Sequence, residues 1–212
     1  MDLKPDLLPK EGKLIVISGP SGTGKGTIVN RVLQETECHF SVSMTTRKPR
    51  EGEIDGVHYY FVTEEQFVDN IAKDGFFEHA AAYGNRYGTP KGPILEKLSK
   101  GIDVLLDIEM QGALQVKKAH PDAVLIFVLP PSLAVLRERL MGRGTETKEA
   151  VELRLSRTLE EMKYIDDYDY MVVNDRLDDA VETVKAIIRA EHAKITMDAD
   201  EVIAHYKKEE EN

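Results

Sequence analysis

The sequence predicts an α/β fold in which a central, mostly parallel sheet is flanked by helices. Four short apolar runs rich in β-branched residues are expected to be strands, at Lys13–Ser18, Asp103–Ile108, Ala123–Leu129 and Tyr170–Val173. Continuous apolar strands of this kind are buried on both faces, as in a parallel sheet. Helical patterns lie between these runs, and such alternation of strand and helix is typical of the α/β class.

The first run ends in a glycine-rich turn, and the helical patterns come after it along the chain. They cover Lys25–Glu35, Pro93–Lys100, Gln111–His120, Ser132–Met141, Lys148–Ile165 and Leu177–Ala193.

One stretch interrupts the alternation and predicts a small mixed subdomain inserted into the sheet. Strands are expected at His39–Thr45 and Gly56–Val62, and a helix at Thr63–Lys73 with a Thr63/Gln66 capping box. Two more strands are expected within Phe76–Tyr87, turning at Gly84-Asn85.

These patterns divide the chain into a core, two insertions and two terminal extensions. The core comprises residues 13–38, 90–136 and 158–195, and the mixed subdomain residues 39–89. A second insertion, residues 137–157, is helical and rich in arginine. The extensions are residues 1–12 and 196–212.

Composition excludes several classes of protein. With 212 residues, 38 acidic and 28 basic side chains and a net charge of −10, the chain should repel nucleic acids. The single cysteine, Cys38, cannot form an intrachain disulfide. The longest uncharged run, Ala123–Leu136, is too short to cross a bilayer. We therefore expect a cytoplasmic protein that binds neither nucleic acid nor membrane.

The glycine-rich turn predicts a phosphate-binding loop. Its residues, between the first strand and the first helix, are Gly19, Pro20, Ser21, Gly22, Thr23, Gly24, Lys25, Gly26 and Thr27. Glycines let backbone N–H groups surround phosphates, the helix N-terminus adds positive charge, and the lysine reaches the transferring phosphate.

One position departs from the usual pattern of such loops. Gly26 stands where a Ser or Thr hydroxyl normally binds magnesium, and Thr27 comes one residue later. Mg²⁺ is then expected to be held mainly by water and nucleotide phosphates. Asp107, which closes a predicted strand, is a candidate second anchor or an ordinary turn residue.

A basic segment, Ser43–Glu53, carries three cations and three hydroxyls within its first eight residues. Alone it is equally typical of a solvated loop. Together with the phosphate-binding loop, it resembles the nucleotide-monophosphate site of the guanylate kinases, and the resemblance extends from Lys13 to Arg189. Further matching motifs are Gly56–Phe61, Tyr87–Thr89, Leu106–Gly112 and Val172–Asp175.

The resemblance implies a P-loop kinase core, an inserted GMP-binding subdomain and a helical lid. It also implies how GMP is bound. Its phosphate would be clamped by Arg47, Arg50, Tyr59 and Tyr87, and its guanine would be read by Ser43, Glu78 and Thr89. Asp107 and Glu109 resemble the acidic pair beside the nucleotide and metal.

The chemistry of these side chains agrees with the implied roles. Guanidinium groups match phosphate oxygens in bidentate pairs. Guanine presents N1–H and a 2-amino group as adjacent donors, which a carboxylate at Glu78 accepts. Adenine presents an acceptor at N1 and would be repelled.

The arginines of the second insertion allow two interpretations. Arg137, Arg139, Arg143, Arg154 and Arg157 alternate with glutamates, as in a salt-bridged solvated helix. The resemblance instead implies that Arg139, Arg143 and Arg154 act with Lys25 in catalysis, leaving the other two unassigned. Asn174 resembles the family's residue near the ATP base, although an Asn at a strand end is also an ordinary turn residue.

The implied activity is transfer of the γ-phosphoryl group of ATP to GMP, and also to dGMP, with Mg²⁺, in purine nucleotide metabolism. Two alternatives stay open: a kinase of another small phosphorylated acceptor, and a non-catalytic protein-binding module of the same fold. A P-loop GTPase is disfavoured because no NKxD-like tetrapeptide is present. The oligomeric state is open, a homo-oligomer included.

Overall fold

The computed structural model describes residues 11–82, 84–142 and 147–210. Within these residues the larger sheet has the order β2-β7-β1-β8-β9, and all its neighbours pair in parallel. Its strands are β1 (Leu14–Ser18), β2 (His39–Phe40), β7 (Val104–Asp107), β8 (Val124–Leu129) and β9 (Tyr170–Val173). The four apolar runs are therefore confirmed as parallel strands.

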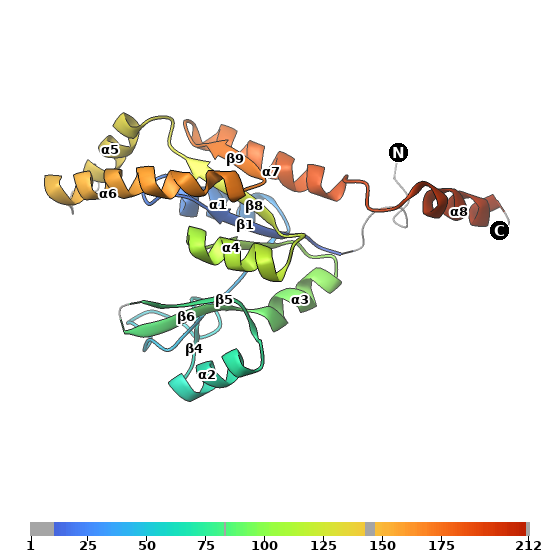
Figure 1. Ribbon diagram of the computed structural model, residues 1–212, viewed down its shortest axis with the longest axis horizontal. Coiled ribbons are helices and arrows are strands. Elements are labelled where there is room, and N and C mark those ends of the chain that lie inside the picture. Colours follow the sequence, from blue (N-terminus) through green and yellow to red (C-terminus); the bar gives the residue numbers. More distant parts are fainter. Residues whose placement is uncertain (1–10, 83, 143–146, 211–212) are drawn as a thin grey trace.

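Helices cover both faces of this sheet (Figure 1). On one face, α1 (Lys25–Glu35) and α7 (Leu177–His192) pack against Ile15 and Ile17 of β1. On the other, α3 (Lys91–Ser99) and α4 (Met110–Ala119) pack against Leu14 and Val16. The whole of β1 is buried because its alternating side chains enter two different cores.

The inserted subdomain is a second sheet, ordered β4-β3-β6-β5, with one helix. Its elements are β3 (Met44–Thr45), β4 (Tyr60–Phe61), α2 (Glu64–Ala72), β5 (Phe76–Ala82) and β6 (Asn85–Pro90). The predicted capping box is confirmed: Thr63 Oγ1 accepts the Gln66 N–H, and Gln66 Oε1 accepts the Thr63 N–H.

Several expected boundaries differ from the structure, and the strand expected over Gly56–Val62 is limited to Tyr60–Phe61 because a turn precedes it. The single strand expected over 39–45 is two strands, because β2 pairs with β7 in the larger sheet and β3 pairs in the smaller one. Helix α3 begins at Lys91, before Pro93, whose missing N–H costs nothing in a first turn. The helix expected over 148–165 ends at Glu161 and continues as a 3₁₀ helix over Met162–Asp167.

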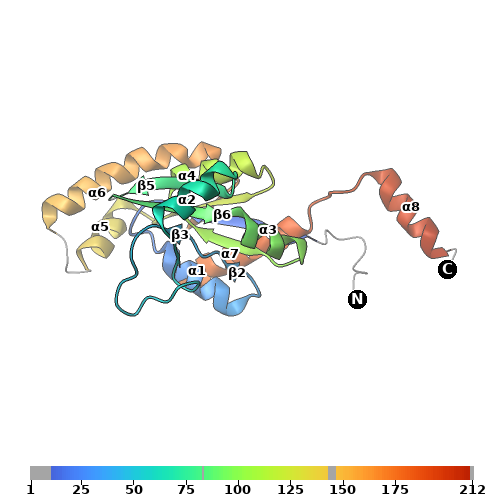
Figure 2. The same cartoon turned by 90° about the horizontal axis from the view of Figure 1, so that it is seen from below.

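The arginine-rich insertion belongs to a pair of helices, α5 (Leu133–Met141) and α6 (Lys148–Glu161). They pack together through Leu136, Leu140, Val151 and Leu155. Figure 2 shows this pair at the end of the molecule opposite α8 (Ala199–Glu210), which projects from the body. In the described part of the chain, no helix combines the length and apolarity needed to cross a membrane.

The sheet core should dominate stability. Ile126 of β8 is fully buried, so Ile126→Ala is expected to reduce the free energy of unfolding by roughly 2–5 kcal/mol. Met171 of the edge strand β9 is 56% exposed, so Met171→Ala should cost less than about 1 kcal/mol. Urea unfolding of both variants checks this, and equal losses would contradict the assigned core.

Candidate active site

The loop after β1 turns so tightly that three of its glycines have a positive φ, Gly22 at +89° among them. Gly19 has φ +136° and Gly24 has φ +91°. A Cβ at Gly19 would lie 2.3 Å from the Val128 carbonyl oxygen, and one at Gly24 would lie 2.4 Å from Asn174 Nδ2. The loop therefore presses against the ends of neighbouring strands, and its N–H groups lead into the N-terminus of α1.

Lys25 folds back over this loop. Its Nζ donates to the carbonyl oxygens of Gly19, at 2.5 Å, and Pro20, at 3.2 Å. Burial lowers its pKa from the ordinary 10.5, and nearby carboxylates oppose that shift. These carboxylates are Asp107, Glu109 and Glu161. Lys25 is thus a desolvated cation in an acidic setting at the centre of the candidate site.

Asp107 and Glu109 lie at the carboxyl edge of the sheet, beside the loop. Asp107 ends β7, and a Cβ at Gly26 would lie 3.9 Å from its Oδ2. Burial raises the Asp107 pKa, with Lys25 lowering it and Glu109 raising it. Glu109 precedes α4 at the N-cap position but makes no side-chain cap bond. Both carboxylates remain available to a ligand above the loop.

Asn174 supports the loop from behind. Its Nδ2 donates to the Thr23 carbonyl at 2.7 Å, while the buried Thr23 hydroxyl donates to the Pro20 carbonyl. The Asn174 backbone N–H donates to the Leu129 carbonyl, tying this position to the end of β8. Asn174, which the sequence also allows to be an ordinary turn residue, thus contacts the phosphate-binding loop directly.

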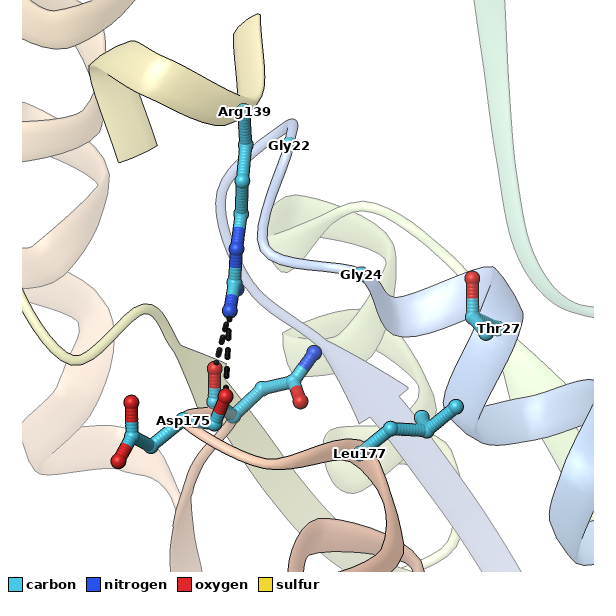
Figure 3. Close-up of a pocket in the computed structure, with 7 residues that line it drawn as sticks. Gly22, Gly24, Thr27, Arg139, Asp175 and Leu177 are labelled. Carbon is cyan, nitrogen blue, oxygen red and sulfur yellow. Dashed lines mark hydrogen bonds between the residues drawn. The ribbon is translucent and has the colours of Figure 1, made fainter. Parts of the chain in front are cut away.

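A pocket of about 430 Å³ opens beside the loop (Figure 3). Its lining residues are Gly22, Gly24, Thr27, Arg139, Asn174, Asp175 and Leu177. Arg139 extends from α5, and its Nη2 donates to the Asn174 carbonyl at 2.9 Å and to the Asp175 carbonyl at 3.5 Å. One arginine of the second insertion therefore forms a wall of this pocket.

The other arginines of that insertion have different surroundings. Arg154 of α6 reaches the loop, where its Nη1 donates to Ser21 Oγ at 2.8 Å. Arg137 of α5 forms an ion pair with Glu152 of α6, so it joins the two helices instead of pairing along one of them. Arg143 falls outside the described residues. Two of the three arginines implied in catalysis, Arg139 and Arg154, therefore lie against the loop or its pocket.

The basic segment forms a cluster on the smaller sheet. Arg47 makes a bidentate pair with Glu53, with both N–O distances 2.9 Å, and its guanidinium carbon lies 5.3 Å from the centre of the Tyr59 ring. The rings of Tyr59 and Tyr87 are 6.1 Å apart. The Arg50 backbone N–H donates to Glu53 at 2.7 Å. Arg47, Tyr59 and Tyr87 therefore lie side by side, and the Arg50 backbone joins them through Glu53.

Glu53 is a participant that sequence reasoning gave no role. Hydrogen bonding to Arg47 lowers the pKa of its carboxyl to about 2, with the Arg50 N–H acting in the same direction. The sequence does contain one signal for this role. Glu53 lies three residues after Arg50 and six after Arg47, so a tight turn can bring its carboxylate to both. Glu161 was also missed, because nothing local marks a helix-end glutamate as a neighbour of Lys25.

Glu78 and Thr89 face each other across β5 and β6. The Thr89 hydroxyl donates to Glu78 Oε1 at 2.6 Å, which lowers the Glu78 pKa, but burial raises it more strongly. Ser43 precedes β3 in the same sheet, and its carbonyl accepts the Tyr60 N–H. Glu78 and Thr89 thus pair within one sheet, which Ser43 adjoins, and the Glu78 carboxylate is partly buried.

Comparison with known proteins identifies the family. A family profile described as guanylate kinase matches residues 11–191. The guanylate kinase of Clostridioides difficile (strain 630) is 50% identical over 201 residues, covering 94% of this chain and 98% of the relative. That of Clostridium tetani is 49% identical over 194 residues, covering 92% and 93%.

A solved structure agrees with the sequence comparison. The crystal structure of guanylate kinase from Anaplasma phagocytophilum superposes with a TM-score of 0.68 at 33% identity, covering 88% of this chain and 89% of that one. The parallel sheet, the phosphate-binding loop and the inserted sheet are thus features of a shared fold. The chain belongs to the guanylate kinase family.

Proposed function

We propose that the chain transfers the γ-phosphoryl group of ATP to GMP, giving ADP and GDP, with ATP on the loop 19–24 and GMP on the smaller sheet. The proposal rests on two separate groups of residues: a phosphate loop that carries Lys25, and a smaller sheet that carries Arg47 for a phosphate and Glu78 for a base. A phosphotransferase between two nucleotides needs one such site for each substrate.

On the donor side, loop N–H groups and Lys25 would hold the β- and γ-phosphates. The adjacent pocket has room for the nucleoside, with Arg139 and Asn174 beside it. Arg154 already contacts the loop through Ser21 and would neutralise charge on the transferring group. We assign residues 137–157 as the lid that carries these arginines, Arg143 among them.

On the acceptor side, Arg47, Arg50, Tyr59 and Tyr87 would bind the GMP phosphate. The Arg47 guanidinium donates twice to Glu53 and once to the Lys48 carbonyl, which uses three of its five donors. Tyrosine hydroxyls add neutral donors without further charge. The Arg47–Glu53 pair fixes the guanidinium before the ligand arrives, which reduces the entropy lost on binding.

Guanine would be read by Glu78, Ser43 and Thr89. Thr89 occupies one Glu78 oxygen and orients the carboxylate, whose remaining lone pairs can accept from guanine N1–H and the 2-amino group. Contacts to the base edge do not involve the ribose, so dGMP is expected to serve as a second acceptor.

No catalytic base is required of the protein. The second pKa of a phosphate monoester is about 6, so the GMP phosphate is mostly dianionic at neutral pH and already nucleophilic. A GMP phosphate oxygen attacks the γ-phosphorus, and the bond to the β–γ bridging oxygen breaks. The protein's residues supply alignment, positive charge and exclusion of water.

A divalent cation fits this site as a complex with the bound nucleotide. Mg²⁺ is typically bound by one or two carboxylates together with substrate phosphates and water. Asp107 and Glu109, beside Lys25 and Gly26, are the carboxylates that would hold it, directly or through water. When bound with ATP, the cation would neutralise phosphate charge.

Because the reaction consumes ATP, we place the protein in the cytoplasm.

A protein-binding module of the same fold is the less favoured function. Such a module would not need Lys25, Gly19 or Gly24 in order to bind a protein partner. This chain has all three residues.

The direct test is ADP formation from Mg-ATP with GMP, dGMP, AMP, CMP or UMP as the acceptor. Turnover should be selective for GMP and dGMP. Lys25→Met should lower kcat by at least about a hundredfold, since charge stabilisation on the transferring group is lost. Selectivity for another monophosphate, or full activity of the variant, would overturn the proposal.

Glu78→Gln tests base reading. The amide presents N–H where guanine also donates, so kcat/KM for GMP should fall by roughly a hundredfold or more, and the preference over AMP should narrow. Because burial raises the Glu78 pKa above 4.5, acidification should weaken GMP binding while an exposed glutamate is still ionised. Protonation of the GMP phosphate affects both proteins alike, so the measurement is the ratio of the parent's KM for GMP to the variant's, which should rise as the pH falls.

Glu53→Gln tests the preset arginine. The variant keeps the shape of the side chain but loses the charge-assisted pair, so the KM for GMP should rise roughly three- to tenfold. The KM for ATP serves as the internal control and should stay unchanged. An unaltered KM for GMP would show that Arg47 does not depend on Glu53.

A further inference from the structure

Strand β5 runs along helix α4, which lies between the two sheets (Figure 1). The β5–β6 register shifts between Phe76 and Glu78, as at a β-bulge. Phe77, in the shifted segment, packs with Ala113 and Val116 of α4. A bulge re-aims neighbouring side chains. Here Glu78, next to Phe77, also contacts α4 rather than pointing away from it.

The contact point on α4 is Gly112, a buried residue in the first turn. A Cβ built on Gly112 would lie 3.2 Å from Glu78 Oε2 and 3.4 Å from both Cδ and Cγ of the same side chain. The 3.2 Å distance is tighter than ordinary van der Waals contact, and the two 3.4 Å distances lie at its lower limit. Glu78 has little room to withdraw, because Thr89 holds Oε1 at 2.6 Å from the other side.

The usual reasons for a glycine do not apply to Gly112. It lies outside the phosphate-binding loop, and its backbone is not left-handed. Gly112 has ordinary helical geometry, and glycine within a helix costs stability relative to alanine. The space that it leaves is filled by the Glu78 carboxylate.

We infer that Gly112 is a positioning residue for guanine recognition: its missing side chain lets the Glu78 carboxylate seat between the first turn of α4 and Thr89. This inference rests on the proposed function, since it concerns how Glu78 is presented to GMP. Helix α4 of the core would thereby help to determine which base the inserted sheet binds.

The test is a double-mutant cycle of Gly112→Ala and Glu78→Asp, with kcat/KM for GMP measured in all four proteins. Gly112→Ala alone should lower kcat/KM roughly tenfold, mainly through the KM for GMP, because the methyl displaces the carboxylate. Glu78→Asp withdraws the carboxylate by one methylene. In that background, Gly112→Ala should cost at most about twofold, giving strong coupling.

Three further readouts separate positioning from general damage. The KM for ATP should stay unchanged in Gly112→Ala, and the midpoint of thermal unfolding should not fall, since alanine is the better helix former. The matched control is Lys118→Ala, an exposed substitution on the same helix, which should keep parental kinetics. Additive losses in the cycle, or an equal rise in both KM values, would overturn the inference.

The parent protein distinguishes the two possible failures. If it is selective for GMP and Gly112→Ala keeps the parental kcat/KM, the inference fails and the proposed function stands. If the parent does not prefer GMP over AMP, the proposed function fails, and the inference fails with it.

Discussion

The parallel pairing of β1 with both β7 and β8 determines where the chemistry lies. Parallel strands end at the same edge of a sheet, so the loop after β1, Asp107 at the end of β7 and Asn174 after β9 converge there. The tight approaches of Gly19 to Val128 and of Gly24 to Asn174 follow from that convergence. A change of register in any of these strands would separate the loop from its support.

Much of this architecture could be predicted from the sequence because its signals are local. Apolar runs, a glycine-rich turn and the Thr63/Gln66 capping box each need only a few neighbouring residues. The split of residues 39–45 between two sheets was not predictable, because pairing partners far along the chain decide it. The same holds for Glu161 beside Lys25 and for Glu78 against Gly112, which only the folded chain brings into contact.

Helix α4 links the two halves of the site. It begins at Met110, directly after Glu109, so its N-terminus adjoins the acidic pair at the sheet edge. The face that carries Gly112 and Val116 receives β5 of the smaller sheet, and Gln115 accepts the His79 backbone N–H. Lateral displacement of the smaller sheet at this point would break packing as well as hydrogen bonds.

The Arg47–Glu53 pair also bears on how the product leaves. With its pKa near 2, Glu53 stays ionised at any physiological pH and cancels the charge of Arg47 before a nucleotide is present. The pair therefore aids binding by fixing the orientation of the guanidinium, not by adding net positive charge to the cluster. Moderate attraction of this kind suits a catalyst that must release a diphosphate once per cycle, because very tight binding would slow every turnover.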